Sequence, residues 1–187
     1  MSGNLYRDIY RTTSIRLQGW DYAQSAAYFV TICTKNKFSY FGSCIDGKVL
    51  LSDKGKLAVL YWNQIPFHFP FIQLGEYCCM PNHMHGIIII NKPDESDRGS
   101  VNETRQCLVS TENIGKKRFQ NQGKQTLSSI IGSYKSIVTK HCRMIDGDFN
   151  WQAGFYEHIV RNDDSLSNIT DYIRNNPHRW NDDEYFS

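Results

Sequence analysis

Two histidines in one short stretch are the residues of this sequence best suited to chemistry. His83 and His85 flank Met84 and precede the apolar run Ile87–Ile90, in a segment whose β-branched residues are typical of a strand. Side chains alternate along a strand, so both imidazoles are expected on one face of a sheet, close enough to share a metal ion. A purely structural role in the core is the alternative. With few carboxylates nearby, the pair would leave positions on a divalent ion open to phosphate oxygens.

The last predicted helix supplies a partner for the histidines. Tyr172 lies at the edge of its apolar stripe, next to Ile173, and Asn176 follows one turn later on the same face. A tyrosine hydroxyl can act as a nucleophile when a metal polarises the phosphodiester that it attacks. The amide oxygen of Asn176 is a candidate third metal ligand.

Hydrophobic periodicity and turn signals define the elements that must position these residues. We expect strands at 27–34, 71–80, 83–90 and within 149–160, helices at 52–66 and 126–142, and a last helix that Asn162 or Asp163 caps and Pro177 ends. The dipeptide Asp46-Gly47 predicts a hairpin with arms at 43–45 and 48–51. This order predicts an α+β protein with a ferredoxin-like βαββαβ core: an antiparallel sheet with helices packed on it, an added N-terminal hairpin and a C-terminal tyrosine-bearing helix.

The length of 187 residues suits a single domain, 1–187. Its formal net charge of +2 is close to neutral, so a surface that binds nucleic acid would have to be local. No apolar run approaches bilayer length and no signal peptide is recognisable, which predicts a cytoplasmic protein with no membrane partner.

Basic residues gather in three places. Residues 1–24 form a basic arm in which arginines alternate with aromatic residues, a pattern that suits phosphates and unstacked bases as well as an arm packed on the domain. Residues 91–125 form a polar loop, expected to be partly disordered, whose second half is either solvated or a phosphate-contacting flap. The candidate DNA-binding residues are Arg7, Arg11, Arg16, Lys116, Lys117, Arg118 and, on the helix at 126–142, Lys135.

Three segments together resemble a known family. Met80–Gly86 (MPNHMHG), Trp151–Asn162 (WQAGFYEHIVRN) and Asp171–Pro177 (DYIRNNP) are similar to the motifs of single-tyrosine HUH transposases of insertion sequences. Within these, the likeness is strongest to the REP-associated tyrosine transposase-like proteins. It extends from Arg16 to Trp180 apart from the polar loop, with the three motifs in the same order. His-x-His alone would be a weak signal.

The resemblance implies an HUH endonuclease fold and a metal-dependent single-stranded DNA endonuclease and strand transferase. His83 and His85 would bind Mg²⁺ or Mn²⁺, and Tyr172 would attack DNA beside a hairpin, at a repeated palindrome or an element end, to leave a 5′-phosphotyrosine. Insertion-sequence members carry glutamine where this chain has the shorter Asn176, so a water or Glu157 could take its place as ligand. The resemblance also implies a nucleoid-associated bacterial protein and leaves monomer and homodimer open.

Other assignments remain open at the level of sequence. Tyr156 competes with Tyr172 for the role of nucleophile, and we favour Tyr172. Glu157, His158 and Tyr156 are candidates for supporting the metal ligands or contacting DNA. The alternative function is a DNA-hairpin-binding protein, derived from a transposase, that does not cleave. A metal-dependent hydrolase of a small phosphoester is a weaker alternative.

Overall fold

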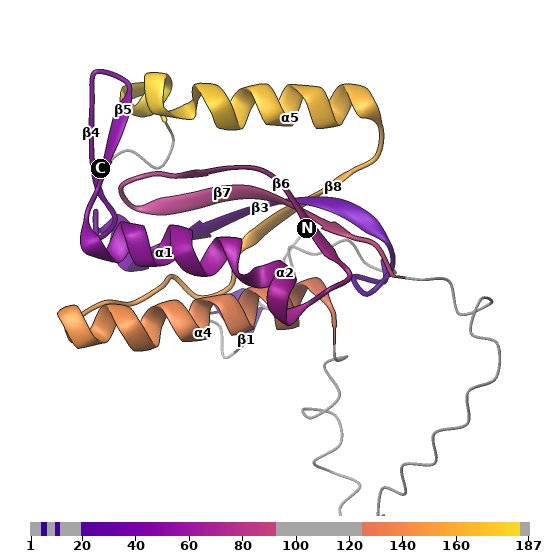
Figure 1. Cartoon of the computed structure of the whole chain (residues 1–187), viewed down its shortest axis with the longest axis horizontal. Coiled ribbons are helices and arrows are strands. Elements are labelled where there is room, and N and C mark those ends of the chain that lie inside the picture. Colours follow the sequence, from indigo (N-terminus) through magenta and orange to yellow (C-terminus); the bar gives the residue numbers. More distant parts are fainter. Residues whose placement is uncertain (1–4, 7–9, 12–19, 93–124, 184–187) are drawn as a thin grey trace, which may run out of the picture.

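A four-stranded antiparallel sheet forms the centre of the molecule. The computed structural model describes residues 5–6, 10–11, 20–92 and 125–183. The strands run in the order β6-β7-β3-β8 across the sheet (Figure 1), with β3 at Ala26–Cys33, β6 at Ile72–Cys79, β7 at His83–Ile90 and β8 at Tyr156–Val160. The chain passes through them as β3, helix, β6, β7, helix, β8. This confirms the predicted ferredoxin-like βαββαβ core.

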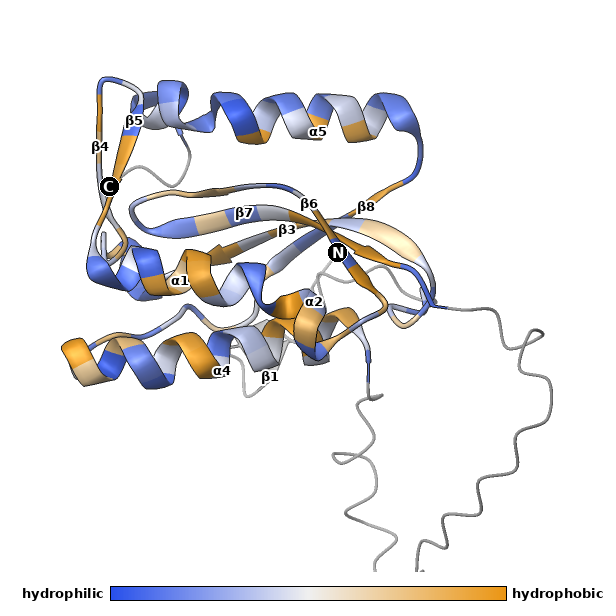
Figure 2. Ribbon diagram, in the orientation of Figure 1, coloured by the Kyte–Doolittle hydropathy of each residue, from blue (hydrophilic) through white to orange (hydrophobic). Residues whose placement is uncertain are grey.

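Helices cover the two faces of this sheet. Figure 1 shows α1 (Asp53–Asn63) and α4 (Leu127–Ile145) on one side and α5 (Asp163–Asn175) on the other. The main core lies between the sheet and helices α1 and α4, where Trp62, Met84 and Ile88 are fully buried. In Figure 2, α5 is largely hydrophilic, and Ile173 is its buried residue. The face beneath α5 is therefore the one on which polar groups can meet.

The strand register decides which side chains share that face. Thr31 of β3 pairs with His85 and with Tyr156, while Cys33 pairs with His83. Directly opposed residues in antiparallel strands point to the same side, and alternate residues along a strand do so as well. His83 and His85 thus share one face of β7, as predicted, because they are alternate residues of the strand.

The predicted hairpin is present and braces the end of the last helix. Strands β4 (Gly42–Ile45) and β5 (Lys48–Leu51) join through Asp46 and Gly47, whose φ values of 50° and 71° suit a type I′ turn. A Cβ on Gly47 would lie 2.2 Å from Nδ1 of His178, so the turn packs closely on η3 (Asn176–Asp182). Cys44 Sγ also donates to the carbonyl of Pro177 at 3.3 Å.

Several predicted boundaries differ from the structure, and two of the differences come from proline. Pro66 lies in the first turn of a new short helix, α2 (Ile65–His68), and Pro177 likewise lies in the first turn of η3. Proline is tolerated there because the first turn needs no backbone N–H donor. Helix α4 runs to Ile145, and the strand predicted within 149–160 is confined to β8, with Trp151 in an isolated bridge to Thr34.

The structure describes parts of the basic arm and only the two ends of the polar loop. Within the arm, β1 (Leu5–Tyr6) and β2 (Tyr10–Arg11) pair as short antiparallel strands that the sequence analysis did not predict. Residues 93–124, which include Lys116, Lys117 and Arg118, lie outside the described residues, as do Arg7 and Arg16. Among the described helices, none is both long and apolar enough to cross a membrane.

Candidate metal centre and active site

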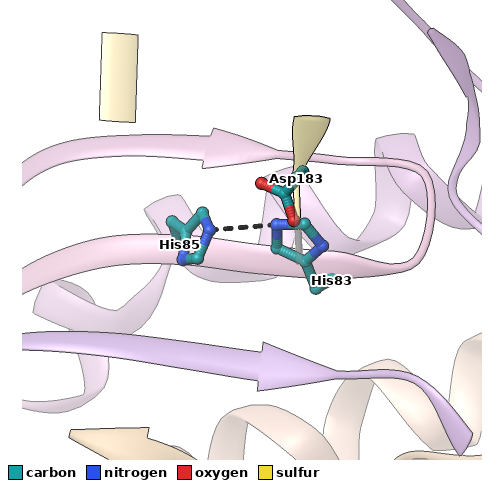
Figure 3. Close-up of side chains that lie close together, drawn as sticks. All are labelled: His83, His85 and Asp183. Atoms are coloured by element: carbon teal, nitrogen blue, oxygen red, sulfur yellow. Dashed lines mark hydrogen bonds between the residues drawn. The ribbon is translucent and has the colours of Figure 1, made fainter. Parts of the chain in front are cut away.

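His83 and His85 lie at the start of β7 and direct their imidazoles toward each other. Their Nε2 atoms are 3.0 Å apart, a contact drawn in Figure 3, and the planes of the two rings are inclined at 68°. Two neighbouring ligands of an octahedral ion with bonds of about 2.1 Å are separated by about 3.0 Å. The spacing of the two nitrogen atoms therefore suits a shared octahedral metal ion.

The two rings are oriented by hydrogen bonds on their Nδ1 atoms. Nδ1 of His83 donates to Oδ1 of Asn82 at 2.8 Å, and Nδ2 of Asn82 donates to the carbonyl of Lys37 at 3.1 Å, which fixes the direction of the amide. Nδ1 of His85 lies 2.8 Å from the hydroxyl of Thr31, which can accept or donate. Such partners hold a ligating histidine in the tautomer that exposes Nε2.

Burial keeps both histidines neutral. His83 is 0% exposed and His85 is 1% exposed, because Trp180 packs 6.0 Å from the ring of His83 and Phe29 stacks 5.3 Å from that of His85. Desolvation, followed by the charges of His85 and Lys37, holds the pKa of His83 well below its usual value. Desolvation likewise lowers the pKa of His85 to about 4, against an opposing effect of Asp183. Neutral imidazole is the form that binds metal.

Asp183 and Asn176 add polar side chains beside the pair, and of these two only Asn176 was predicted from the sequence. Asp183, just after η3, places a carboxylate oxygen so that it and one nitrogen of each histidine all lie within 4.8 Å of one another (Figure 3). Asn176 is 1% exposed, and its Nδ2 donates to that carboxylate at 2.6 Å. The other amide atom of Asn176, Oδ1, is buried with no hydrogen-bond partner in the structure. A buried acceptor without a partner is costly, so it is a fitting ligand for a cation.

The residues present therefore fit a hard divalent cation. They offer two imidazole nitrogens, the amide oxygen of Asn176 and the carboxylate of Asp183. The oxygen donors suit Mg²⁺ and Mn²⁺, and the imidazole nitrogens suit transition metals. No cysteine joins the cluster among the described residues.

Tyr172 on α5 lies over the same site. Its hydroxyl is 3.4 Å from Nε2 of His85, and its ring stands edge-on to Phe29 at 6.0 Å. Asn162 caps the start of α5 by accepting from the backbone of Ser165, and Arg174 pairs with Glu76 of β6 at 2.9 Å. The helix is thus tied at one end and docked on the sheet, so that Tyr172, 37% exposed, projects toward the histidines.

A hollow of about 490 Å³ opens beside Tyr172 and reaches His85. Tyr156 and His158 of β8 face it, since they pair with Thr31 and Phe29 on the histidine face. A second hollow on the other side of Tyr172 shares its wall at Phe29 and His158. The walls of the first hollow are formed by Phe29, Thr31, Lys37, His85, Tyr156, Glu157, His158 and Tyr172.

The strand register changes the interpretation of Glu157. It pairs with Val30, a fully buried residue of the main core, so the register directs its side chain to the opposite face from His83 and His85, although the residue also borders the hollow. Its carboxylate is not among the clustered donor atoms, whereas that of Asp183 is. Asp183 is therefore better placed than Glu157 to replace Asn176 as a candidate metal ligand.

Lys135 is engaged inside the protein rather than directed toward the hollow. Its ammonium donates to the carbonyls of Gln152 at 2.7 Å and Gly154 at 2.8 Å, and it lies 5.8 Å from the ring centre of Trp151. Burial lowers the pKa of Lys135. Its described contacts hold the segment that precedes β8. The side chain of Arg11, the remaining candidate of the basic arm, lies outside the description.

One known protein resembles this chain over almost its whole length. No protein-family model matches the chain. An uncharacterised protein of Haemophilus influenzae is 36% identical over 179 residues, which cover 95% of this chain and 94% of that protein. The chain belongs to the same family as this protein.

Other relatives connect this family to transposases. A second Haemophilus influenzae protein, provisionally named a REP-associated tyrosine transposase, is 24% identical over 164 residues, or 84% of this chain and 73% of that one. A solved structure of the REP-associated tyrosine transposase bound to a REP hairpin superposes with a TM-score of 0.54 at 18% identity, covering 85% of this chain and 70% of that one, which shows a shared fold. The resemblance indicated by the three sequence motifs is confirmed, and the fold is transposase-like.

Proposed function

We propose that this transposase-like protein is a metal-dependent nuclease and strand transferase that acts on single-stranded DNA next to a hairpin. The observation that carries the proposal is the position of the Tyr172 hydroxyl, 3.4 Å from Nε2 of His85, which itself faces Nε2 of His83 at 3.0 Å. A nucleophile beside two neutral imidazoles that could hold a metal ion is an arrangement suited to metal-assisted phosphodiester transfer.

His83, His85 and Asn176 would hold Mg²⁺ or Mn²⁺, with Asp183 as a further oxygen donor. When bound, the ion would polarise the phosphate and stabilise its negative charge. The hollow beside Tyr172 would receive the phosphodiester. The tyrosine oxygen would attack phosphorus and lose its proton, while the bond from phosphorus to the 3′-oxygen breaks. The products are a 5′-phosphotyrosine and a free 3′-hydroxyl, and a 3′-hydroxyl can later attack the phosphotyrosine to join the strands.

Hairpin binding is proposed from the relatives. The solved transposase that shares this fold is bound to a REP hairpin, and a single-stranded segment leading from a hairpin would fit the hollow beside Tyr172. We propose the same class of DNA for this chain.

The test is formation of a covalent adduct between protein and labelled DNA. Hairpins with single-stranded flanks of random sequence are incubated with the protein and Mn²⁺, and adducts are resolved on a denaturing gel. We expect Tyr172→Phe to abolish the adduct. Tyr156→Phe is the matched control, because Tyr156 lines the same hollow and is 41% exposed, and it should retain the adduct.

Other outcomes would redirect the assignment. An adduct that survives Tyr172→Phe and vanishes in Tyr156→Phe would move the nucleophile to β8. Hairpin binding that persists in His83→Ala and in the presence of a chelator, with no adduct on any flank, would instead establish a binding protein that does not cleave.

A further inference from the structure

The turn after β3 brings a lysine to the candidate active site. This turn, η1 (Lys35–Lys37), follows directly on the strand whose Cys33 pairs with His83, so it lies at the histidine end of the sheet. The backbone N–H of Thr34 donates to the carbonyl of Asn82 at 2.9 Å, and the side chain of Asn82 donates to the carbonyl of Lys37 at 3.1 Å. The turn is therefore joined to the residue that orients His83.

Two adjacent residues of this turn have left-handed backbone conformations. The φ values are 55° at Asn36 and 56° at Lys37. Asparagine adopts this region readily, whereas lysine does so rarely because its Cβ approaches the following carbonyl. Hydrogen bonds hold the turn in place: the hydroxyl of Thr34 donates to the carbonyl of Phe38 at 2.7 Å. Strain of this kind gathers at functional sites, where it aims a particular group.

Lys37 is the cationic residue that this turn places at the site. It is half-buried and forms part of the wall of the hollow that also exposes His85 and Tyr172. Its charge acts on His83, being one of the causes that lower the pKa of that residue. Lys35, two residues earlier in the same turn, is exposed and does not line the hollow.

A phosphodiester is a natural binding partner for a cation at this position. A phosphodiester is an anion, and its two non-bridging oxygens gain charge when a nucleophile adds to phosphorus. A fixed ammonium in a partly desolvated hollow stabilises such charge more strongly than water does.

We propose that Lys37 binds the phosphodiester that Tyr172 attacks, with its ammonium on a non-bridging oxygen. This inference rests on the proposed function and names the group that would hold the phosphate. Lys37 keeps its protons throughout; the bond from Tyr172 to phosphorus forms and the bond to the 3′-oxygen breaks, while the ammonium offsets the added charge.

The first test compares rates of adduct formation under single-turnover conditions with hairpin DNA and Mn²⁺. Lys37→Met keeps the aliphatic stem and should slow the reaction about 100-fold, the loss typical for one group that stabilises transition-state charge. Lys37→Arg should recover most of the rate. Lys35→Met, in the same turn, should react as the wild type does. Thermal unfolding of each variant establishes that the fold is kept.

A substrate change separates phosphate contact from a structural effect. A methylphosphonate at the mapped cleavage position replaces one charged oxygen with a methyl group. The difference in rate between wild type and Lys37→Met should largely disappear on this DNA. An equal loss on both substrates, or a Lys37→Met rate equal to that of the wild type, would overturn the proposal.

A second measurement does not depend on cleavage. Affinity for the same hairpin DNA is measured over a range of salt concentrations with Tyr172→Phe protein, alone and combined with Lys37→Met or Lys35→Met. Loss of one phosphate contact should reduce the slope of log affinity against log salt by about 0.7 for Lys37→Met and leave it unchanged for Lys35→Met. If the wild type forms no adduct, the proposed function fails, and an unchanged slope for Lys37→Met would then overturn the phosphate contact as well.

Discussion

At the scale of single residues, the site depends on groups that never touch the metal position. Asn82 connects the carbonyl of Lys37 to Nδ1 of His83 through two hydrogen bonds, and its side chain is 1% exposed. Because Nδ1 must carry the proton for Nε2 to present its lone pair, Asn82 selects the tautomer that binds metal. The hydroxyl of Thr31 can accept a proton from Nδ1 of His85, so it permits the same tautomer there without selecting it.

We therefore expect Asn82→Ala to weaken Mn²⁺ binding by about 10- to 100-fold, the usual effect of removing a partner behind a metal-ligating histidine. Isothermal titration of the purified protein measures this affinity. Asn63→Ala is the matched control, because the amide of Asn63 donates to the hydroxyl of Tyr77 on the exposed side of α1. Equal Mn²⁺ affinities for the two variants would show that the ring of His83 is held by packing alone.

The sequence allowed some of these residues to be predicted and concealed others, for a physical reason. His83 and His85 were found because strand alternation is a local rule. The role of Asn82 in orienting His83 could not be predicted, because the residue that fixes its amide, Lys37, lies 45 positions away. Asp183 was not predicted because Pro177 was expected to end the last helix, whereas it lies in the first turn of η3, which carries the chain back to the histidines.

At the scale of elements, one glycine sets the distance between β7 and α1. Gly86 follows His85 on the core face of β7, and a Cβ there would lie 2.3 Å from the ring of Trp62. The absent side chain lets the fully buried indole pack flat on the strand that carries both histidines. The order of strands and helices could be predicted because periodicity and turn chemistry are local properties of the sequence. The close approach of Trp62 to Gly86 could not be predicted, because it depends on packing between elements that are far apart in the chain.

Gly86→Ala should therefore lower the free energy of unfolding by about 1 to 3 kcal/mol, the usual cost of overpacking a filled core. Gly132→Ala is the control: a Cβ there meets nothing within 4 Å, and alanine is favoured over glycine in the interior of α4. It should be neutral or stabilising. Chemical denaturation measures both changes, and a Gly86→Ala protein as stable as the wild type would mean that α1 shifts to make room.

At the scale of the whole molecule, the sheet separates stability from chemistry. The face beneath α1 and α4 buries the main core, while the face beneath α5 buries His83 and His85. Burial of an ionisable imidazole costs desolvation free energy, so these two residues add little to stability by themselves. Burying ionisable groups in neutral form makes stability depend on pH, because the unfolded chain can protonate them and the native state resists it.

The sign of that dependence follows from the lowered pKa values of both histidines. With the metal removed by a chelator, His85 titrates near 6.5 when unfolded and at about 4 when folded, so the unfolded state binds more protons between these values. Stability should be intact above pH 6.5 and fall as the pH drops toward 4, by about 3 kcal/mol for His85. His83 contributes in the same direction. Denaturation across this range should show a shallower loss for His85→Gln than for the control His68→Gln, which changes an exposed side chain. Identical slopes would mean that His85 is already protonated in the native state.

Saturating Mn²⁺ should raise the free energy of unfolding of the wild type by about 3 kcal/mol at 100 times its dissociation constant, and that gain should disappear in His85→Gln.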